Sequence, residues 1–593
     1  MKKKLNKTII ATCLILVFPF IACDDYMEVS PYGSVSEETL ATKAGVTNLL
    51  TGAYSLIDGV NGSFFWGDNS NWLFSDMASH EATRGSTSNA NITFFEAHTI
   101  LPTHEYVEKK WDGCYDGIQR ANDVLRILPK VSEKELPAGE ATQIKAEAMF
   151  IRGLLHYELA KTWKNVPYID ETVIYNSDYL VPNTDRVYPK IEADFQFAAD
   201  NLAATKSDAG RANSWAAKSF LAVVQMQQGK YSEALPLLTD IVTNGVTASG
   251  DKYALVPNYW DNFKASTENN SESVFAVQYT VNDGASGING NQGRLLGQPV
   301  VPPCAGGGSS TVSFSTVNAF KTDPGTGLPL PDTYNDSDIT NDMGLAESAP
   351  FTPYTGTLDP RLDLTVGRRD IPLLDWGLMR RSWGPNQLER GCYVLKKFFF
   401  YKADLDVNTE SFGGWTTINN INYCFIRFAD ILLRAAECEV ETGSLAKAEQ
   451  YVNMVRARAA DPVGWVKTYL DNDPSRGFTD TPAANYFVGL YNGQFTANGQ
   501  AYARKAVRFE RRLELACEGH RFFDLQRWDN GTGYMADELN AVIAHERTTP
   551  ATFPALQNAV FTKGRNEIYP IPQAQIDLSM KDEESVLVQN PNY

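Results

Sequence analysis

Two segments of the chain set tryptophan rings beside amide, carboxylate and guanidinium groups, in stretches rich in Gly and Asn. A saccharide offers apolar C–H faces and a rim of hydroxyls, so its binding site needs exposed aromatic platforms with hydrogen-bonding groups beside them. Both segments have that composition and therefore predict a ligand site. The predicted contact residues are Trp66, Asp68, Asn69, Trp72 and Arg84 in the first segment, and Trp376, Trp383 and Trp415 in the second.

Other tryptophans lie on apolar stripes with helical spacing, which indicates core positions. These are Trp111, Trp163, Trp215 and Trp528. Trp72 is followed directly by Leu73 and Phe74, which favours a core position for that ring even within the first segment.

Three glutamates, Glu510, Glu514 and Glu518, recur every four residues with arginines between them. Two carboxylates one helical turn apart can meet the roughly 5–10 Å separation that glycoside hydrolysis needs. One of them must then keep a proton as the general acid, whereas arginines on every side hold both ionised. The spacing instead predicts a helix with i,i+3 and i,i+4 ion pairs, which is a scaffold and not a catalytic site.

Other motifs for catalysis or for a cofactor are missing from the sequence. The six histidines form no HExxH, and there is no GxSxG, no Walker loop and no GxGxxG after a strand, so we predict no cofactor and no metal centre. Six cysteines beyond residue 23 show no CxxC and no zinc spacing, which predicts buried free thiols. One loop could offer carboxylates to calcium or be a solvated acidic loop; its aspartates are Asp323, Asp332, Asp336 and Asp338.

The N-terminus resembles the export signal of a bacterial lipoprotein. Four lysines precede an apolar run at 8–22, which is too short to span a bilayer. The run ends at Cys23 after a small residue, as in a lipobox, so Cys23 is the predicted lipidation site; an ordinary signal peptide with a chance cysteine is the alternative. Asp24 and Asp25 follow, and acidic residues there mark transport to the outer cell surface in lipoproteins of this kind.

The charge of the chain argues against nucleic acid as a partner. The 593 residues carry a net charge of −18, and removal of residues 1–22 takes away four lysines and no acid, which leaves −22. A body this acidic repels phosphate backbones, and no concentrated basic run opposes that repulsion.

Helical periodicity dominates the first half of the chain, over residues 111–125, 141–163 and 185–205. The spacing of Ala222, Gly229 and Ala234 recurs as Ala436, Gly443 and Ala448. In both sets a helix, a tight Gly turn and a second helix follow one another, as in tetratricopeptide repeats.

Between these repeats, the composition of residues 245–425 shifts to Gly, Pro, Asn, Ser and aromatic residues. This stretch predicts irregular loops with short strands, such as 273–279. Long loops inside a helical protein are usually functional, which fits the ligand segments above.

Several motifs together resemble the SusD/RagB family over almost the whole mature chain. They are RFADILLRAAE at 427–437, AEQYVNMVRAR at 448–458, RFERRLELACEGHRFFDLQRW at 508–528, YPIP at 569–572, QNPNY at 589–593, DPRL at 359–362 and GRAN at 210–213. The resemblance implies a mostly α fold with four tetratricopeptide-like helix pairs, a large loop-rich face and a few short strands. It also implies a SusC-like TonB-dependent transporter as partner, and a protein that binds its ligand without cleaving it.

The resulting prediction is a lipid-anchored protein of the outer membrane that faces the cell exterior, binds a glycan and delivers it to that transporter. The same scaffold binding peptides or another nutrient is one alternative, and a surface glycoside hydrolase is another. The expected parts are a signal peptide at 1–22, an N-terminal helical part at 23–245, and a C-terminal part at 246–593. The last divides into a loop-rich insertion at 246–425 and a helical region at 426–593.

Overall fold

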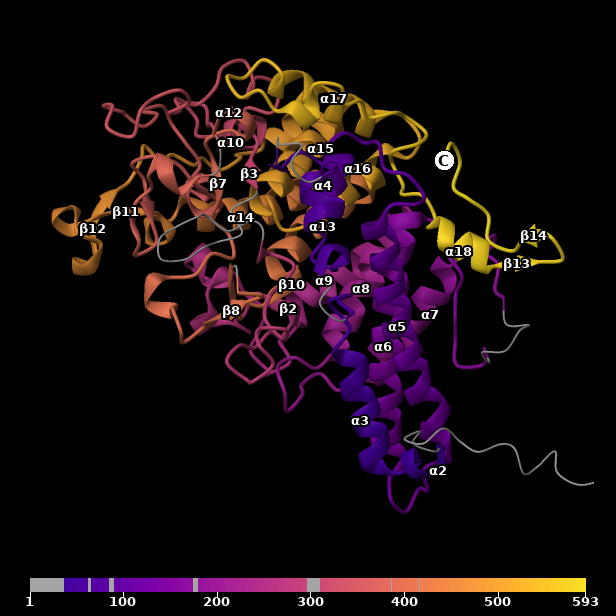
Figure 1. The fold of residues 1–593 in the computed structure, drawn as a ribbon. Coiled ribbons are helices and arrows are strands. Elements are labelled where there is room, and N and C mark those ends of the chain that lie inside the picture. Colours follow the sequence, from indigo (N-terminus) through magenta and orange to yellow (C-terminus); the bar gives the residue numbers. More distant parts are fainter. Residues whose placement is uncertain are drawn as a thin grey trace, which may run out of the picture.

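The computed structural model describes residues 37–61, 65–84, 90–173, 180–295, 310–384, 387–414 and 416–593. Long helices stand upright on one side of the molecule, and a broader part with short strands and loops lies beside them (Figure 1). This is the mostly helical architecture that the sequence predicts. Cys23 and Trp415 lie outside the described residues.

Four N-terminal helices, α3, α5, α6 and α7, pack side by side. The helices of this half are α2 (Glu37–Leu40), α3 (Lys43–Tyr54), α4 (Ala90–Glu96), α5 (Glu105–Ile127), α6 (Ala138–Trp163), α7 (Tyr188–Asn201), α8 (Ser214–Gln227) and α9 (Tyr231–Asn244). The predicted helices correspond to α5, α6 and α7. On α5, Trp111, Cys114 and Ile118 form the buried stripe that the periodicity indicates.

The two repeat units fold as the spacing predicts. The first is α8 and α9, and the second is α13 (Phe428–Thr442) and α14 (Leu445–Ala460). Ala222 and Ala436 are fully buried at the helix contacts, and Gly229 turns the first pair with a φ of +73°. α13 packs against α9 as well as α14, so the two units are joined into one helical body.

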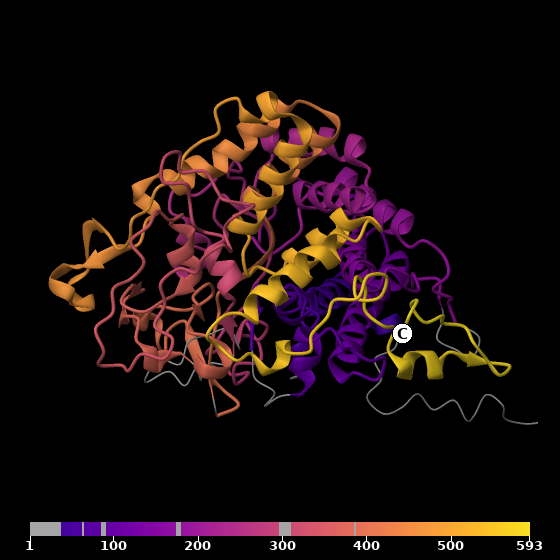
Figure 2. The ribbon, with the colours of Figure 1, turned by 90° about the horizontal axis from the view of Figure 1, so that it is seen from above.

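Most of the C-terminal helices lie over the junction between the upright helices and the strand-containing part (Figure 2), whereas the last one, α18 (Gln573–Leu578), lies apart from them near the C-terminus (Figure 1). The C-terminal helices are α15 (Gln494–Glu514), α16 (Arg521–Asp529), α17 (Tyr534–Glu546) and α18, and three short helices precede them in the loop-rich part, α10 (Phe314–Asn318), α11 (Arg361–Thr365) and α12 (Gln387–Arg390). α15 packs against α13 and α14, which extends the helical body to the C-terminal region.

Short antiparallel strands occur mainly in the loop-rich part, with a few in the N-terminal and C-terminal segments. They are β1 (Ala82–Thr83), β2 (Ser273–Val277), β3 (Thr311–Val312), β4 (Val366–Gly367), β5 (Pro372–Leu373), β6 (Gly377–Leu378), β7 (Val394–Leu395), β8 (Thr409–Phe412), β9 (Thr416–Asn419), β10 (Tyr423–Arg427), β11 (Lys467–Tyr469), β12 (Phe478–Pro482), β13 (Met580–Lys581) and β14 (Glu584–Ser585). One sheet has the order β1-β3-β7-β4, and the remaining strands pair as β10-β2, β8-β9, β5-β6, β11-β12 and β13-β14. β10 leads directly into α13, so the β10–β2 pair attaches the loops to the helical body.

One continuous hydrophobic core runs from Leu50 on α3 to Leu587 near the C-terminus. It includes the helical half and the loop-rich half, and the division at residue 245 stays a prediction. Among the described residues, no helix is both long enough and apolar enough to cross a membrane.

Candidate functional site

An aromatic cluster forms around Trp66 in the first predicted segment. Trp66 lies in the short helix η1 (Phe65–Gly67), and its half-buried ring stacks on that of Tyr106 from α5, with 4.9 Å between centroids and 3° between planes. Phe65 stacks on Trp66 at 4.8 Å and meets Phe412 of β8 edge to face at 6.2 Å. The cluster thus joins the first loop segment to α5 and to the β8–β9 hairpin.

Asp68 and Asn69 are buried directly behind this cluster. The Asn69 amide oxygen accepts a hydrogen bond from Lys110 Nζ at 2.8 Å, and its amide nitrogen donates to the Ile57 carbonyl at 3.0 Å. Burial raises the pKa of Asp68, and hydrogen bonds from Ser70 oppose that rise. In this structure both side chains are internal supports of the loop, not surface contacts.

The other two predicted contact residues of the first segment, Trp72 and Arg84, differ in burial from each other. The Trp72 ring is only 2% exposed and belongs to the core, as Leu73 and Phe74 beside it indicate. Arg84 is half-buried, and its backbone nitrogen donates to Glu96 Oε1 at 2.7 Å. Burial lowers the pKa of Arg84, and Tyr106 is among the groups that act on its charge. Arg84 is thus tied to α4 through Glu96.

The second predicted segment folds as the β5–β6 hairpin and the turn after it. Trp376 is buried, and its indole nitrogen donates to the Phe400 carbonyl at 3.0 Å, so its ring supports the hairpin from inside. Trp383 is half-exposed, with the Arg380 guanidinium 5.8 Å from its ring centroid. Of the two described tryptophans in this segment, Trp383 alone keeps surface that a ligand could reach.

A groove of about 560 Å³ lies between α3 and the end of β2. Its lining residues are Thr51, Tyr54, Ser55, Ile57, Asp58, Val60, Asp208, Gly210, Arg211, Ala276, Val277, Gln278, Tyr279, Thr280, Ile288 and Asn289. The Arg211 guanidinium lies 5.1 Å from the centre of the Tyr54 ring, and both side chains bind Glu147, the Tyr54 hydroxyl at 2.7 Å and Arg211 Nη1 at 3.0 Å. These contacts fix the orientation of one wall.

The opposite wall carries Tyr279 with Gln278 and Asn289. The Tyr279 backbone nitrogen donates to Asn422 Oδ1 at 2.9 Å, which holds this segment against the start of β10. At the floor, burial raises the pKa of Asp58 to about 7, with the charge of Asp68 acting in the same direction. The groove thus offers two phenol rings, amides, a guanidinium and a carboxyl that changes charge near neutral pH.

This groove is connected through the backbone to the segment that carries Trp66. The Asn69 backbone nitrogen donates to the Asp58 carbonyl at 2.6 Å, so the groove floor and the first segment are hydrogen-bonded together. On the other wall, the loop at Gly287 packs on the β8–β9 hairpin so closely that a Cβ there would lie 3.3 Å from Phe412. Segments on both sides of the groove therefore contact segments that carry the ring cluster.

Sequence reasoning missed Tyr54, Tyr279 and Arg211 as groove residues. Tyr54 is the last residue of a helix, and Arg211 belongs to the GRAN motif at 210–213, which indicates the family and not a ligand site. Their only sequence signal is an aromatic or polar residue next to a helix or strand end, and that signal is too common to single them out.

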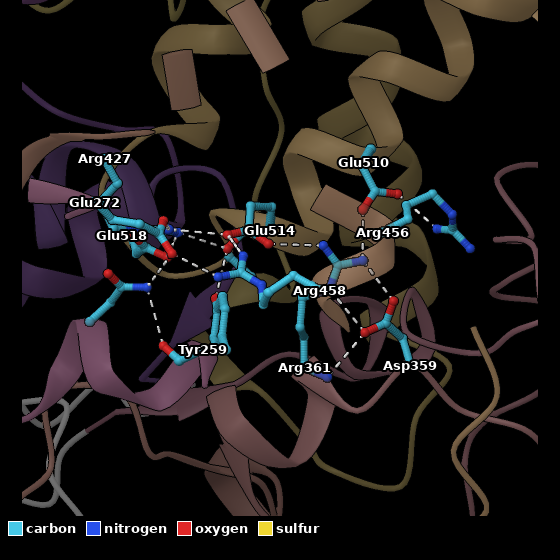
Figure 3. Close-up of polar contacts among 12 residues, drawn as sticks. Tyr259, Glu272, Asp359, Arg361, Arg427, Arg456, Arg458, Glu510, Glu514 and Glu518 are labelled. Atoms are coloured by element: carbon cyan, nitrogen blue, oxygen red, sulfur yellow. Dashed lines mark hydrogen bonds and ion pairs between the residues drawn. The ribbon is translucent and has the colours of Figure 1, made fainter. Parts of the chain in front are cut away.

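The glutamates of α15 lie in a buried network of ion pairs (Figure 3). Glu514 binds Arg361 at 3.0 Å, Arg427 at 3.1 Å and Arg458 at 2.6 Å. The predicted i,i+3 and i,i+4 pairs along the helix are wrong, because all three arginines come from other elements. Arg511 also binds outside its own helix, at Asp430 and Asp524.

The network nevertheless fits the expectation of a scaffold. The surrounding arginines hold the pKa of Glu514 at about 2 against the effect of burial, and Arg427 and Lys397 lower the pKa of Glu518. A general acid must keep its proton at the working pH, and Glu514 does not. These carboxylates are also fully buried, beyond the reach of a polysaccharide.

Two of the four aspartates of the acidic loop form ion pairs. Asp332 binds Lys505 at 2.7 Å, and Asp338 binds His545 at 3.2 Å. Within the described ranges, no group of three or more His, Cys, Asp or Glu side chains is arranged to hold a metal ion. The five described cysteines are free thiols; Cys424 is half-buried, and the other four are buried: Cys114, Cys392, Cys438 and Cys517.

Comparison with known proteins gives a consistent result. Residues 271–593 match the SusD family, and residues 25–226 match a family described as starch-binding associating with outer membrane. A SusD-like protein of Formosa agariphila is 27% identical over 538 residues, which are 86% of this chain and 88% of the relative. A solved laminarin binding SusD-like protein has a TM-score of 0.58 at 25% identity, with 93% of this chain and 100% of that chain covered.

A SusD superfamily protein from Bacteroides vulgatus has the same fold, with a TM-score of 0.66 at 18% identity over 93% of this chain and 99% of that chain. The family match spans more than half of the present sequence, and the fold agrees over nearly its full length. The chain therefore belongs to the SusD family.

Proposed function

We propose that this protein binds a glycan at the cell surface and delivers it to a SusC-like TonB-dependent transporter of the outer membrane. The observation that carries the proposal is the groove between α3 and β2, whose Asp58 is hydrogen-bonded to the segment that carries Trp66. Support also comes from the solved laminarin-binding relative, which shares the fold over its whole length.

The groove has the size and the chemistry for a saccharide chain. Small-molecule sites commonly enclose about 300–1,000 Å³, and this groove has about 560 Å³. The Tyr54 and Tyr279 rings would lie against apolar sugar faces, while Gln278, Asn289 and Arg211 would bind hydroxyls. A longer chain would continue over Trp66.

Delivery requires that the protein stay at the membrane. Cys23 is the proposed acylation site, and each buried methylene of an acyl chain contributes about 0.8 kcal/mol to anchoring. The family described as associating with outer membrane supports this location. Replacement of Cys23 by alanine is expected to release the protein from the membrane fraction and to abolish labelling with a radioactive fatty acid.

The proposed role is binding without catalysis. Glu514 is ionised, and both glutamates of α15 are buried, which removes the most obvious candidates for a glycosidase acid and nucleophile. Peptides or other nutrients as cargo, and hydrolysis of the glycan, are outcomes that the following experiment would detect.

Isothermal titration calorimetry with laminarin, other polysaccharides and peptides tests the proposal. We expect at least one glycan to bind, and Tyr279→Ala and Trp66→Ala each to weaken binding at least tenfold. Trp465→Ala removes a half-buried tryptophan outside the groove and is the matched control. Trp383→Ala measures the contribution of the second segment.

Three results would contradict the proposal. Glycan affinity unchanged in both Tyr279→Ala and Trp66→Ala would exclude the groove. Peptide binding with no response to any glycan would identify another cargo. Release of reducing sugar by purified protein, abolished by one Asp or Glu substitution, would identify an enzyme.

A further inference from the structure

A second groove of about 550 Å³ lies far from the first, among the C-terminal helices at the top of Figure 1. Its walls are α15, α17, the start of α16 and the loop at 331–335. The basic residues that line it are Arg504, Lys505, Arg508, Arg512, Arg521 and His545, and the acidic ones are Asp332, Asp537 and Glu538. An excess of cations here is unexpected in a chain with a net charge of −18.

Most of these charges are neutralised by a partner. Lys505 binds Asp332 at 2.7 Å, and Arg521 binds Glu538 at 3.2 Å. Arg504 binds a glutamate outside the groove, Glu441, at 2.6 Å. These three cations therefore stabilise the walls and are not available to a ligand.

His545 adds a further positive charge that is also paired. Its Nε2 lies 3.2 Å from Asp338 Oδ1. Hydrogen bonds and charge from Asp338 and Glu546 raise the pKa of His545 to about 9 against the effect of burial, so the imidazolium is charged at neutral pH.

Arg508 and Arg512 are different. Of the described residues, none places a carboxylate within 4.0 Å of either guanidinium. Arg512 is 6% exposed and donates to neutral groups, the Tyr334 hydroxyl at 2.8 Å and the Ser315 carbonyl at 3.4 Å. The carboxylates of Glu81 and Glu538 act on it only from beyond ion-pair distance.

Arg508 is held between two aromatic rings. Its guanidinium carbon lies 4.9 Å from the ring centroid of Trp528 and 4.9 Å from that of Tyr534. Stacking fixes the plane of the guanidinium without neutralising its charge. Asp537 is the one lining carboxylate without an ion pair among the described residues, and it is exposed at the rim.

A buried charge is normally paired, because its removal from water is costly unless an opposite charge compensates. Arg508 and Arg512 lie one helical turn apart on α15, and the groups in direct contact with their guanidinium groups are neutral. Their N–H donors can bind two oxygens of one anion. We propose that this groove binds the sulfate or carboxylate group of an acidic saccharide through Arg508 and Arg512. This inference rests on the proposed function in one respect only, namely that the molecule carrying the anionic group is a saccharide.

Calorimetry with four small probes tests this inference on the purified protein. Glucose 6-sulfate and glucuronate should bind, glucose should not, and inorganic sulfate should bind at least tenfold more weakly than glucose 6-sulfate. Arg508→Gln should lower the affinity for glucose 6-sulfate at least tenfold, and Arg508→Lys should restore part of it. Binding should weaken as NaCl is raised, as for any partly exposed charge pair.

Arg120→Gln is the matched control. Arg120 is a half-exposed arginine of α5, away from this groove, and it binds Asp116 of the same helix. Arg512→Lys is a second variant that retains the buried charge, and thermal unfolding verifies that each variant folds. Equal affinity for glucose and glucose 6-sulfate, or sulfate binding unchanged in both Arg508→Gln and Arg512→Lys, would overturn the inference. Inorganic sulfate binding as tightly as glucose 6-sulfate would overturn the saccharide assignment.

The two proposals fail independently. Titration of laminarin, which carries no charge, reports on the groove beside α3, and Arg508→Gln should leave it unchanged. Anion binding without any polysaccharide binding would refute the proposed function and leave the oxyanion site, whereas the reverse would refute the site alone.

Discussion

Replacement of Glu514 by glutamine is the sharpest test of the buried network. The network contains five acids and five bases: Glu272, Asp359, Glu510, Glu514 and Glu518 with Arg361, Arg427, Arg456, Arg458 and Lys397. Its charges balance, so Glu514→Gln leaves one uncompensated positive charge in the interior. Breaking a buried pair in this way costs about 3–5 kcal/mol.

The pKa of Glu514 gives an independent magnitude. A folded pKa of about 2 against an ordinary value of 4.5 corresponds to about 3 kcal/mol of stability at neutral pH. Because the folded pKa is the lower one, this contribution is complete above about pH 5 and is lost as the pH falls from about 4.5 toward 2. The two magnitudes agree.

Urea unfolding followed by circular dichroism at pH 7 and at acidic pH is the assay. The free energy of unfolding should be about 3–5 kcal/mol lower for Glu514→Gln at pH 7, and the difference from wild type should shrink as the pH is lowered below 4. Glu140→Gln is the control: Glu140 binds Lys43 at an exposed position, where a pair contributes about 1 kcal/mol or less. A Glu514→Gln protein as stable as the control at pH 7 would refute the charge-balance reasoning.

Three further predictions concern the groove and its supports. Trp72→Ala should lower the free energy of unfolding by about 3–5 kcal/mol, because the ring is buried in the core. Trp66→Ala should change the free energy of unfolding much less and should lower glycan affinity instead. An equal fall in the free energy of unfolding for both variants would contradict the assigned positions. The folded pKa of Asp58 is raised from 3.8 to about 7, so Asp58 lowers the stability as the pH rises from about 4 to 7. Asp58→Asn should therefore make the stability fall less steeply over that range in urea titrations at several pH values, and an unchanged slope would contradict the assignment. A Cβ at Gly67 would lie 2.5 Å from the backbone nitrogen of Lys110. Gly67→Ala should therefore lower the free energy of unfolding by about 1–3 kcal/mol and alter the near-ultraviolet circular dichroism of the stacked Trp66 ring. An unchanged spectrum would show that the loop accommodates the methyl group.

Elements whose packing is periodic could be predicted from the sequence. α5, α6 and α7 follow their apolar stripes, and the small residues at matched spacing correctly marked α8–α9 and α13–α14 as hairpins of helices. These signals are local, because a helix that packs on one face repeats its apolar residues at a fixed period.

Contacts between distant segments could not be predicted. Glu514 has arginines three residues before and two before it, yet its partners come from α11, β10 and α14, because tertiary packing turns Arg511 toward Asp430 and Asp524. Likewise, composition could not separate Trp376, which packs inward, from Trp383, which stays near the surface. An aromatic ring in an irregular loop is equally suited to either position until the fold is known.

The position of Glu514 late in the chain has a consequence for the order of folding. Arg361, Arg427 and Arg458 all precede it, and they lack this counter-charge until α15 docks. An N-terminal fragment that ends before α15 would therefore carry unbalanced arginines at its centre and resist collapse. The centre of the molecule should therefore reach its native packing only once α15 is present.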